Sequence, residues 1–267
     1  MASSAISTAQ KAPALRGAAP AKSHTSDEII IRPATLADMP VVADISVDAY
    51  ATNEVTYFLA PKAHIYRDDN LRATRQSTRG RFLHPRNLSI VACLASDPST
   101  PIAMAQFIRL GNDSGAKEYL KSRGLRTRLW IFVLTWFFYF YNMVENIIWP
   151  NRSDDKEARK LFNSWISEDS QKYWKSHPER ANRWQAQQVF VSPYFQGKGI
   201  GKKLMLPVMQ KAQEERVIMG LAASPEGERL YRKLGFELLG NFIHRVPGTG
   251  DEGGGIMIWY PEGMEPK

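Results

Sequence analysis

The residues of this sequence best suited to chemistry lie between Val189 and Lys203, VFVSPYFQGKGIGKK. An apolar strand pattern leads there into a glycine-rich, basic turn. The first N–H groups of a helix lack intrahelical partners and point, with the positive end of the helix dipole, at whatever lies in front of them. The stretch therefore predicts a phosphate-binding anion site. The helix that would form it shows an apolar stripe at Leu204, Met205, Val208 and Met209.

The spacing of the glycines excludes two common phosphate loops. A dinucleotide loop requires G-x-G-x-x-G, whereas these glycines fall as G-x-G-x-G. A nucleoside-triphosphate loop requires G-x-x-x-x-G-K-[ST], whereas Gln196 occupies its first glycine position and Lys203 its hydroxyl position. The pattern Gln-x-x-Gly-x-Gly at Gln196, Gly199 and Gly201, after a strand and opening a helix, instead resembles the acetyl-CoA pyrophosphate loop of the GCN5-related N-acetyltransferase (GNAT) superfamily.

A second segment supports the resemblance. Residues 224–237 read SPEGERLYRKLGFE, which is similar to the short helix of the same family that ends in L-Y-x-K-x-G-F-E and leads into a strand. Independently of the family, Pro225 suits the start of a helix and Gly235 suits its end. Two motifs and two helix boundaries therefore agree.

The resemblance implies acetyl-CoA as co-substrate and assigns roles along the chain. The pantetheine would lie along a strand edge at Phe190, Val191 and Ser192, with the Val191 N–H stabilising the developing oxyanion. The pyrophosphate would rest on backbone N–H groups from Gln196 to Lys202, with lysines 198, 202 and 203 as countercharge. Together the implied cofactor-binding residues are Phe190, Val191, Gln196, Gly197, Lys198, Gly199, Ile200, Gly201, Lys202, Ser224 and Tyr231.

Tyr231 is the predicted general acid. An expelled thiolate needs a proton, and a phenol with a pKa of about 10 keeps one at neutral pH. The alternative is a core aromatic residue of an amphipathic helix. The general base is not identified, because the strand at 184–189 reads WQAQQV and has no carboxylate where many relatives have a Glu. Asp48 and Glu54, near the end of the first helix, are candidates, although both suit a structural role.

The elements that must position these residues follow from periodicity and turn signals. We expect a strand at 28–32, a capping box from Thr35 to Asp38 that opens a helix to about Tyr50, a helix at 62–82, and a hairpin of strands 88–94 and 102–110. We further expect strands at 184–191, 217–222, 236–245 and 256–260, helices at 199–216 and 226–234, and a hairpin loop at 248–255. The fold class predicted is α/β: a GNAT fold with a mixed, mostly antiparallel sheet of about six to seven strands flanked by helices.

Residues 111–183 form a predicted helical insertion before the cofactor strand, like that of the fungal branch of the superfamily. Its centre, 129–141, is apolar on all sides over only 13 residues, which is short of the ~20 that a membrane span needs. We expect this centre to pack over the core as a roof of the acceptor pocket. An interfacial segment on anionic lipid, preceded by Arg126 and Arg128, is the alternative.

Composition limits the ligands and the cellular setting that can be expected. The 267 residues carry a net charge of +8, which favours anionic ligands, yet no basic stripe with spaced aromatics indicates nucleic acid. The single Cys93 excludes an intrachain disulfide, no histidine spacing suits a metal, and a reducing, cytoplasmic setting is expected. Residues 1–27 are predicted to be a disordered arm, with a mitochondrial presequence as the alternative, and 28–267 a single acetyltransferase domain.

These observations predict an acetyl-CoA-dependent N-acetyltransferase that acts on a primary amine of a small molecule or peptide by direct attack on the thioester. The apolar, Trp-rich insertion favours a hydrophobic amine. The alternative is a catalytically weak acyl-CoA-binding protein of the same fold, with membrane-surface contact through 129–141. The acceptor, the base, the acyl-chain preference and the oligomeric state are left open.

Overall fold

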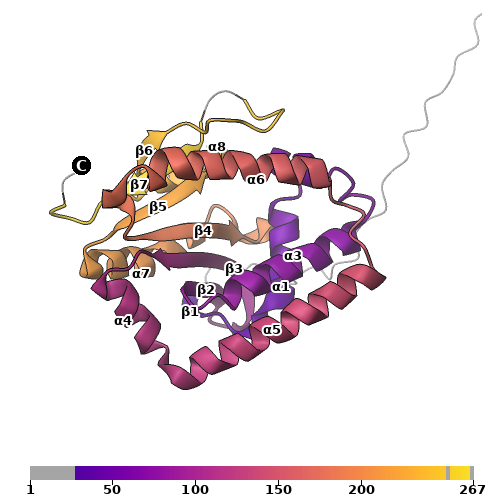
Figure 1. The fold of residues 1–267 in the computed structure, drawn as a ribbon, viewed down its shortest axis with the longest axis horizontal. Helices are drawn as coiled ribbons and strands as arrows, with labels where there is room; N and C mark the ends of the chain where they lie inside the picture. Colours follow the sequence, from indigo (N-terminus) through magenta and orange to yellow (C-terminus); the bar gives the residue numbers. More distant parts are fainter. Residues whose placement is uncertain (1–27, 251–252, 265–267) are drawn as a thin grey trace, which may run out of the picture.

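A computed structural model describes residues 28–250 and 253–264 of the chain. The predicted arm at 1–27 lies outside these residues. The described part forms one seven-stranded sheet with the order β1-β2-β3-β4-β5-β7-β6 (Figure 1). All neighbouring strands are antiparallel except β4 and β5, so the predicted fold class is confirmed. The strands are β1 (Ile29–Pro33), β2 (Asn87–Leu94), β3 (Asp97–Leu110), β4 (Arg183–Val191), β5 (Ile218–Ala223), β6 (Glu237–Gly240) and β7 (Gly255–Trp259).

The helices cover both faces of the sheet because successive strand residues point to opposite sides. Ile90 and Ala92 of β2 face the core under α7, whereas Val91 and Cys93 face α1, and Cys93 is 0% exposed. The helices are α1 (Met39–Ala49), α2 (Glu54–Leu59), α3 (Arg67–Phe82), α4 (Ser114–Ser122), α5 (Gly124–Ile148), α6 (Lys156–Ser170), α7 (Ile200–Glu215) and α8 (Pro225–Lys233).

The capping box predicted at Thr35 is confirmed. Asp38 accepts from the Thr35 N–H at 2.7 Å and from its hydroxyl at 2.9 Å. Arg32 donates hydrogen bonds to the same carboxylate from two guanidinium nitrogens, at 2.8 and 2.9 Å. This box opens the 3₁₀ turn Leu36–Asp38, which continues into α1. The start of α1 is therefore held against β1, and its C-terminal end lies near β4 in the middle of the sheet.

Two other elements differ from the expectations. The helix predicted at 62–82 begins only at Arg67, and a separate short helix, α2, precedes it with Asn53 as its N-cap. The strand predicted at 236–245 ends at Gly240, because the Tyr173 hydroxyl holds the carbonyl of Asn241 and turns the chain away. Apolar periodicity indicated both segments but not the residues at which they begin and end.

Between β4 and β5 the sheet divides. The two strands pair from Arg183 to Gln185 and then separate. On its other side β4 continues along β3, with a register shift opposite Gln106 that leaves Gln187 as an extra residue. From Ala186 onward, one edge of β4 therefore has no partner strand within the described residues.

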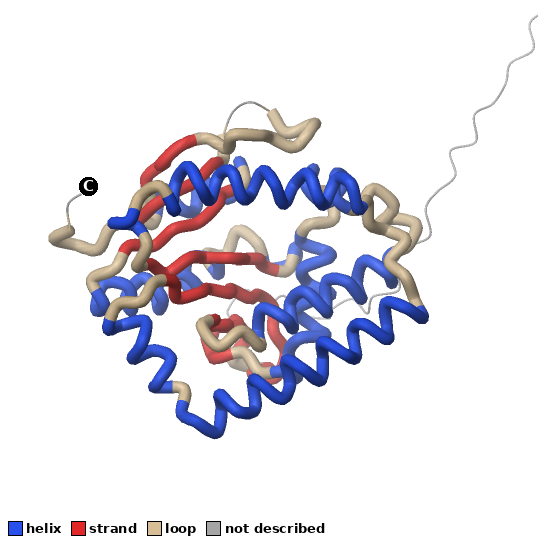
Figure 2. Tube along the Cα trace, in the orientation of Figure 1, coloured by secondary structure: helices blue, strands red, loops and turns tan. Residues whose placement is uncertain are grey.

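The insertion between β3 and β4 is helical, as expected, and comprises α4, α5, α6 and the π-helical turn Gln171–Lys175. In Figures 1 and 2, α5 runs along the lower edge of the molecule and α6 crosses its upper part, with the central strands between them. The expectation that 129–141 roofs the acceptor pocket is wrong. No residue of α5 is buried, because the helix lies outside α3 and directs most of its side chains away from the protein. It is also longer than the apolar run, at 25 residues.

Candidate active site

The glycine-rich turn forms an open cradle in front of α7. Gly197 and Gly199 have φ values of +76° and +74°, a region that other residues rarely adopt, and Gly199 is the N-cap of the helix. A Cβ at either glycine would meet nothing within 4 Å. The first intrahelical bond runs from the Lys203 N–H to the Gly199 carbonyl at 3.2 Å. The N–H groups of residues 200–202 precede it and are directed into the open space, which fits a diphosphate.

Gly201 has a different role from its two neighbours. A Cβ there would lie 2.9 Å from the Leu230 side chain, so this glycine lets α7 approach α8 closely. The close approach places the helix that contains Tyr231 beside the cradle. The third glycine of the motif thus shapes the site through packing, whereas Gly197 and Gly199 leave open space beside the backbone.

Along β4, successive backbone N–H groups point alternately towards β3 and towards the gap between β4 and β5. The Ser192 N–H donates to the Ile102 carbonyl at 2.9 Å, so the Val191–Ala103 pair is a non-hydrogen-bonded one and the Val191 N–H points away from β3. By the same alternation the Val189 N–H also faces the gap, and that of Phe190 does not. The Val191 carbonyl accepts from the Gln196 side chain at 3.1 Å. Val189 was missed by the sequence analysis, although its two-residue spacing from Val191 could have indicated it.

Two tyrosines face the gap between β4 and β5. Tyr231 is 9% exposed, its ring lies edge-on to Phe236 at 5.8 Å, and no described residue hydrogen-bonds its hydroxyl. Burial raises the pKa of Tyr231 well above its usual range, so the phenol is a proton donor and not a base. The Tyr50 hydroxyl donates to the Val189 carbonyl at 3.3 Å, and burial raises the pKa of Tyr50 to about 12. Tyr50 was also missed, because a single aromatic residue at a helix end has no distinctive spacing.

A groove of about 730 Å³ connects the cradle, the edge of β4 and Tyr231. Ser224 lies in its wall as the N-cap of α8, where its oxygen accepts from the Gly227 N–H at 3.2 Å and its hydrogen stays available to donate. Of the predicted cationic residues, Lys202 lines the groove, and Lys198 lies over the Phe195 ring at 5.1 Å. Arg229 and Lys233 of α8 also line it and were not predicted. The predicted residues lining it are Phe190, Val191, Gln196, Gly197, Gly199, Ile200, Gly201, Lys202, Ser224 and Tyr231.

Next to the groove, a cavity of about 400 Å³ continues past Tyr50 and Tyr231 between the separated strands. Among the described residues, those that line it supply amides and hydroxyls but no carboxylate and no cation. Of the two candidate bases, Asp48 is paired with Arg67 at 2.7 Å and lines none of these spaces. Glu54 lines the groove, and so does Glu226 at the start of α8.

A third space, of about 480 Å³, lies beyond Glu54 and Ser224. Its walls are mainly aromatic and aliphatic side chains of α6, the π-helical turn and the segment after β6. Trp165 stands in one wall, stacked on His244 at 5.4 Å and on Phe58 at 5.5 Å. Ser224 and Glu54 line both this space and the groove, so the two spaces adjoin at these residues. The main apolar lining residues are Phe162, Trp165, Ile166, Trp174, Phe242 and Val246.

Comparison with known proteins agrees with this arrangement. Residues 165–238, from the middle of α6 into β6, match the family model described as an acetyltransferase (GNAT) domain. The matched part contains the cradle, the edge of β4 and Tyr231. Residues 165–238 are therefore identified as part of a GNAT acetyltransferase domain. No curated protein matches the sequence.

Solved structures are similar to this chain at low sequence identity, and one of them has a TM-score above 0.5. A histone acetyltransferase HPA2-related acetyltransferase from Corynebacterium glutamicum is 17% identical, with 89% of this chain and 98% of that chain covered and a TM-score of 0.54. The N-acyl amino acid synthase FeeM from uncultured soil microbes is 11% identical, with 88% and 92% covered and a TM-score of 0.47. The PaiA N-acetyltransferase from Thermoplasma acidophilum is 13% identical, with 87% and 99% covered and a TM-score of 0.43.

Proposed function

We propose that the protein transfers an acetyl group from acetyl-CoA to a primary amine of an acceptor with an apolar body. The observation that supports this most directly is the continuity of the groove. The free amides of α7, the unpaired edge of β4 and the Tyr231 hydroxyl all open into it. Acetyl-CoA would supply a thioester as the electrophile, and the chain supplies the groups that hold it and move protons.

The cradle and the strand edge would hold the co-substrate at its two ends. The N–H groups at residues 200–202 suit the diphosphate, and Lys202, Arg229 and Lys233 add positive charge along the same groove. The outward N–H groups of Val189 and Val191 suit an extended chain that pairs like an added strand. The Val191 N–H, predicted from the sequence as the oxyanion donor, is one of the two amides that face the gap.

The proton movements follow from the groups that face the gap. As the amine nitrogen bonds to the acyl carbon, the carbon–sulfur bond breaks, and the Tyr231 hydroxyl donates a proton to the departing thiolate. The amine loses its own proton to water in the groove, and Glu54, which lines the groove, is the candidate carboxylate to receive it. Solvent then reprotonates Tyr231, and the atoms and charges balance.

The apolar space beyond Glu54 favours acceptors with an aromatic or branched aliphatic body. Its size, about 480 Å³, suits a small molecule or a single bulky side chain. Binding of the acceptor's apolar part there would direct its amine through the opening at Ser224 towards the β4 edge. The hydrophobic acceptor was expected to bind under residues 129–141. It is instead assigned to the apolar space, one wall of which is formed by α6.

The test is turnover with a panel of amines. We expect the purified protein to bind coenzyme A by calorimetry and to release its thiol with aryl- or branched-alkyl amines, each product gaining one acetyl group by mass spectrometry. Trp165→Ala should raise KM for such amines about tenfold, while methylamine and coenzyme A affinity change little. Leu161→Ala, an exposed residue on the same helix, is the matched control. No binding of coenzyme A would refute the proposal.

A second candidate is a protein that binds acyl-CoA with little transfer. The absence of any carboxylate in the lining of the cavity between β4 and β5 favours it. Tight coenzyme A binding with no acetyl transfer to any amine of the panel would select this candidate.

A further inference from the structure

Helix α5 exposes apolar side chains on most of its circumference. Its exposed large residues are between 46% (Met143) and 80% (Leu125) accessible, and no charged residue occurs between Arg128 and Glu145. Soluble monomers rarely expose a continuous apolar patch of this extent. The exposed large apolar residues are Leu125, Leu129, Trp130, Phe132, Val133, Trp136, Phe137, Tyr139, Phe140, Tyr141, Met143, Val144, Ile147 and Ile148.

One narrow stripe attaches α5 to the rest of the protein. Asn142 accepts from Arg79 of α3 at 2.5 Å, Glu145 accepts from Gln76 at 2.7 Å, and the Arg79 guanidinium lies 4.0 Å from the Phe138 ring. The half-buried residues of the helix recur every three or four positions on this side: Ile131, Leu134, Phe138, Asn142 and Glu145. The opposite side is outward, and at helical spacing it comprises Leu129, Trp136, Phe140 and Ile147.

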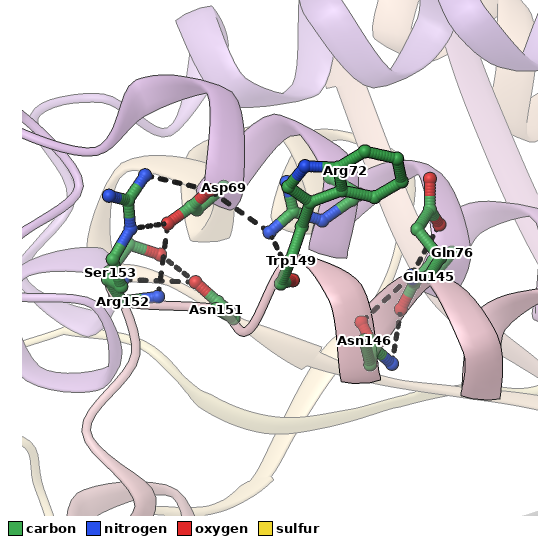
Figure 3. Close-up of polar contacts among 9 residues, drawn as sticks. All are labelled: Asp69, Arg72, Gln76, Glu145, Asn146, Trp149, Asn151, Arg152 and Ser153. Carbon is green, nitrogen blue, oxygen red and sulfur yellow. Dashed lines mark hydrogen bonds and ion pairs between the residues drawn. The ribbon is translucent and has the colours of Figure 1, made fainter.

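Hydrogen bonds and ion pairs also hold the C-terminal end of α5 against α3. Buried Asp69 of α3 accepts from Arg152 at 2.7 Å and from Arg72 at 3.0 Å, and Arg72 also donates to the Trp149 carbonyl at 2.8 Å (Figure 3). The figure shows the α5 end and the following loop drawn against α3 by these bonds. The outward face of α5 is therefore held in a fixed orientation along one edge of the molecule.

Length alone would allow α5 to cross a bilayer. At 25 residues it is about 37 Å long, against a hydrocarbon core of about 30 Å, and among the described residues it is the one helix long and apolar enough to do so. The topology opposes it. A single crossing would place β3 and β4, which precede and follow the insertion, on opposite sides of the membrane, yet these strands are paired in one sheet.

We propose that α5 docks the protein on the surface of a bilayer that contains anionic phospholipid, with the helix axis parallel to the membrane. The outward side chains would enter the boundary between headgroups and acyl chains, where Trp and Tyr are favoured. The polar face that such a helix normally provides itself is provided here by α3. Docking in this way is independent of acyl transfer.

The charges near α5 support anionic lipid over a second copy of this chain. Arg126 and Arg128 are exposed at its first turns, and each basic residue near an anionic surface contributes about 1 kcal/mol of attraction. The only acidic residue of α5, Glu145, faces inward and accepts from Gln76. Two α5 helices packed together would therefore bring no carboxylate of the helix to either arginine.

Vesicle sedimentation of the full-length protein tests the proposal. We expect the protein to pellet with phosphatidylcholine vesicles that contain phosphatidylserine and much less with phosphatidylcholine alone. Trp136→Gln/Phe140→Gln/Ile147→Gln should lower partitioning at least about tenfold. Leu206→Gln/Leu238→Gln, at exposed apolar residues of α7 and β6, should not. Arg126→Gln/Arg128→Gln should abolish the preference for phosphatidylserine.

The orientation is tested with fluorophores attached at Leu129→Cys, Trp136→Cys and Ile147→Cys. A helix in the membrane plane gives similar quenching by depth-resolved lipid quenchers at all three positions, whereas a spanning helix gives a steep gradient and overturns the in-plane geometry. Equal vesicle binding by the wild type and the triple glutamine variant would overturn membrane docking. So would a dimer in sedimentation velocity that the triple variant converts to monomer, without vesicle binding by either protein.

Discussion

The Tyr231 hydroxyl faces the gap between β4 and β5 with no hydrogen-bond partner among the described residues. Because burial raises its pKa, it stays protonated throughout the range in which enzymes are assayed. We expect Tyr231→Phe to lower kcat for acetyl transfer by ~10²-fold or more, with coenzyme A affinity nearly unchanged. Steady-state thiol release and calorimetry measure the two effects. Unchanged kcat at all pH values would show that Tyr231 only packs the helix.

Glu54 and Asp48 form a matched pair of carboxylates near the end of α1. Glu54 lines the groove, whereas Asp48 is exposed and paired with Arg67 outside it. Glu54→Gln should therefore lower kcat/KM about tenfold or more, and the loss should be greatest for amines of high pKa, which must be deprotonated before attack. Asp48→Asn should leave kcat/KM within about twofold, because an exposed ion pair contributes little. Equal effects of both substitutions would remove Glu54 from the mechanism.

At the residue scale, motif spacing predicts the groups that work through the backbone. Gln196, Gly199 and Val191 all lie at the groove because a strand–turn–helix sequence constrains them locally. Tyr50, Arg229 and Lys233 escaped prediction because their proximity depends on how α1 and α8 pack on the sheet.

At the element scale, the turn before α7 depends on glycine conformation. Gly199→Val would force a β-branched residue to φ +74°, costing ~1–2 kcal/mol of folding free energy, and would place its side chain in the open cradle. Coenzyme A affinity should fall at least about tenfold by calorimetry. The control is Gly80→Ala in α3, where a Cβ meets nothing within 4 Å and helix propensity should add ~1 kcal/mol of stability without any change in affinity.

Asp69, which links α3 to the end of α5 and the loop after it, titrates at low pH. Hydrogen bonds from Arg152 and Arg72 lower the pKa of Asp69 from 3.8 to about 2. Its contribution to stability is therefore complete above pH of about 4 and is lost as the pH falls towards 2. Asp69→Asn should lower the melting temperature at neutral pH, and the difference from wild type should shrink over that interval. A difference that stays constant from neutral pH to pH about 2 would contradict this assignment.

Elements with strong periodicity were predictable, and those set by tertiary contacts were not. The β2–β3 hairpin and α7 agree with the sequence analysis within a few residues, because alternation and an apolar stripe specify them. For α5 the sequence shows an apolar helix but not which neighbour covers it. Buried helices and membrane-contacting helices have the same composition. The sequence therefore could not distinguish a helix that packs over the acceptor pocket from one that contacts lipid.

At the scale of the whole molecule, the apolar space next to the groove and the exposed face of α5 are built by different parts of the insertion. Helix α6 supplies a wall of the apolar space, whereas α5 lines none of the three spaces described. Substitutions on the outward side of α5 should therefore leave acetyl transfer to soluble amines unchanged while they abolish vesicle binding. Joint loss of both activities would indicate that α5 also supports the groove.

Cys93, the only cysteine of the chain, is enclosed between β2 and α1 with no accessible surface, and burial raises the pKa of its thiol. The thiolate is the form that attacks thiol reagents, so the folded protein should not react with them, and one reactive sulfur should become accessible only on unfolding. Colorimetric detection of released coenzyme A thus needs no correction for the enzyme. A cysteine introduced anywhere on the surface becomes a unique attachment point without removal of the native one.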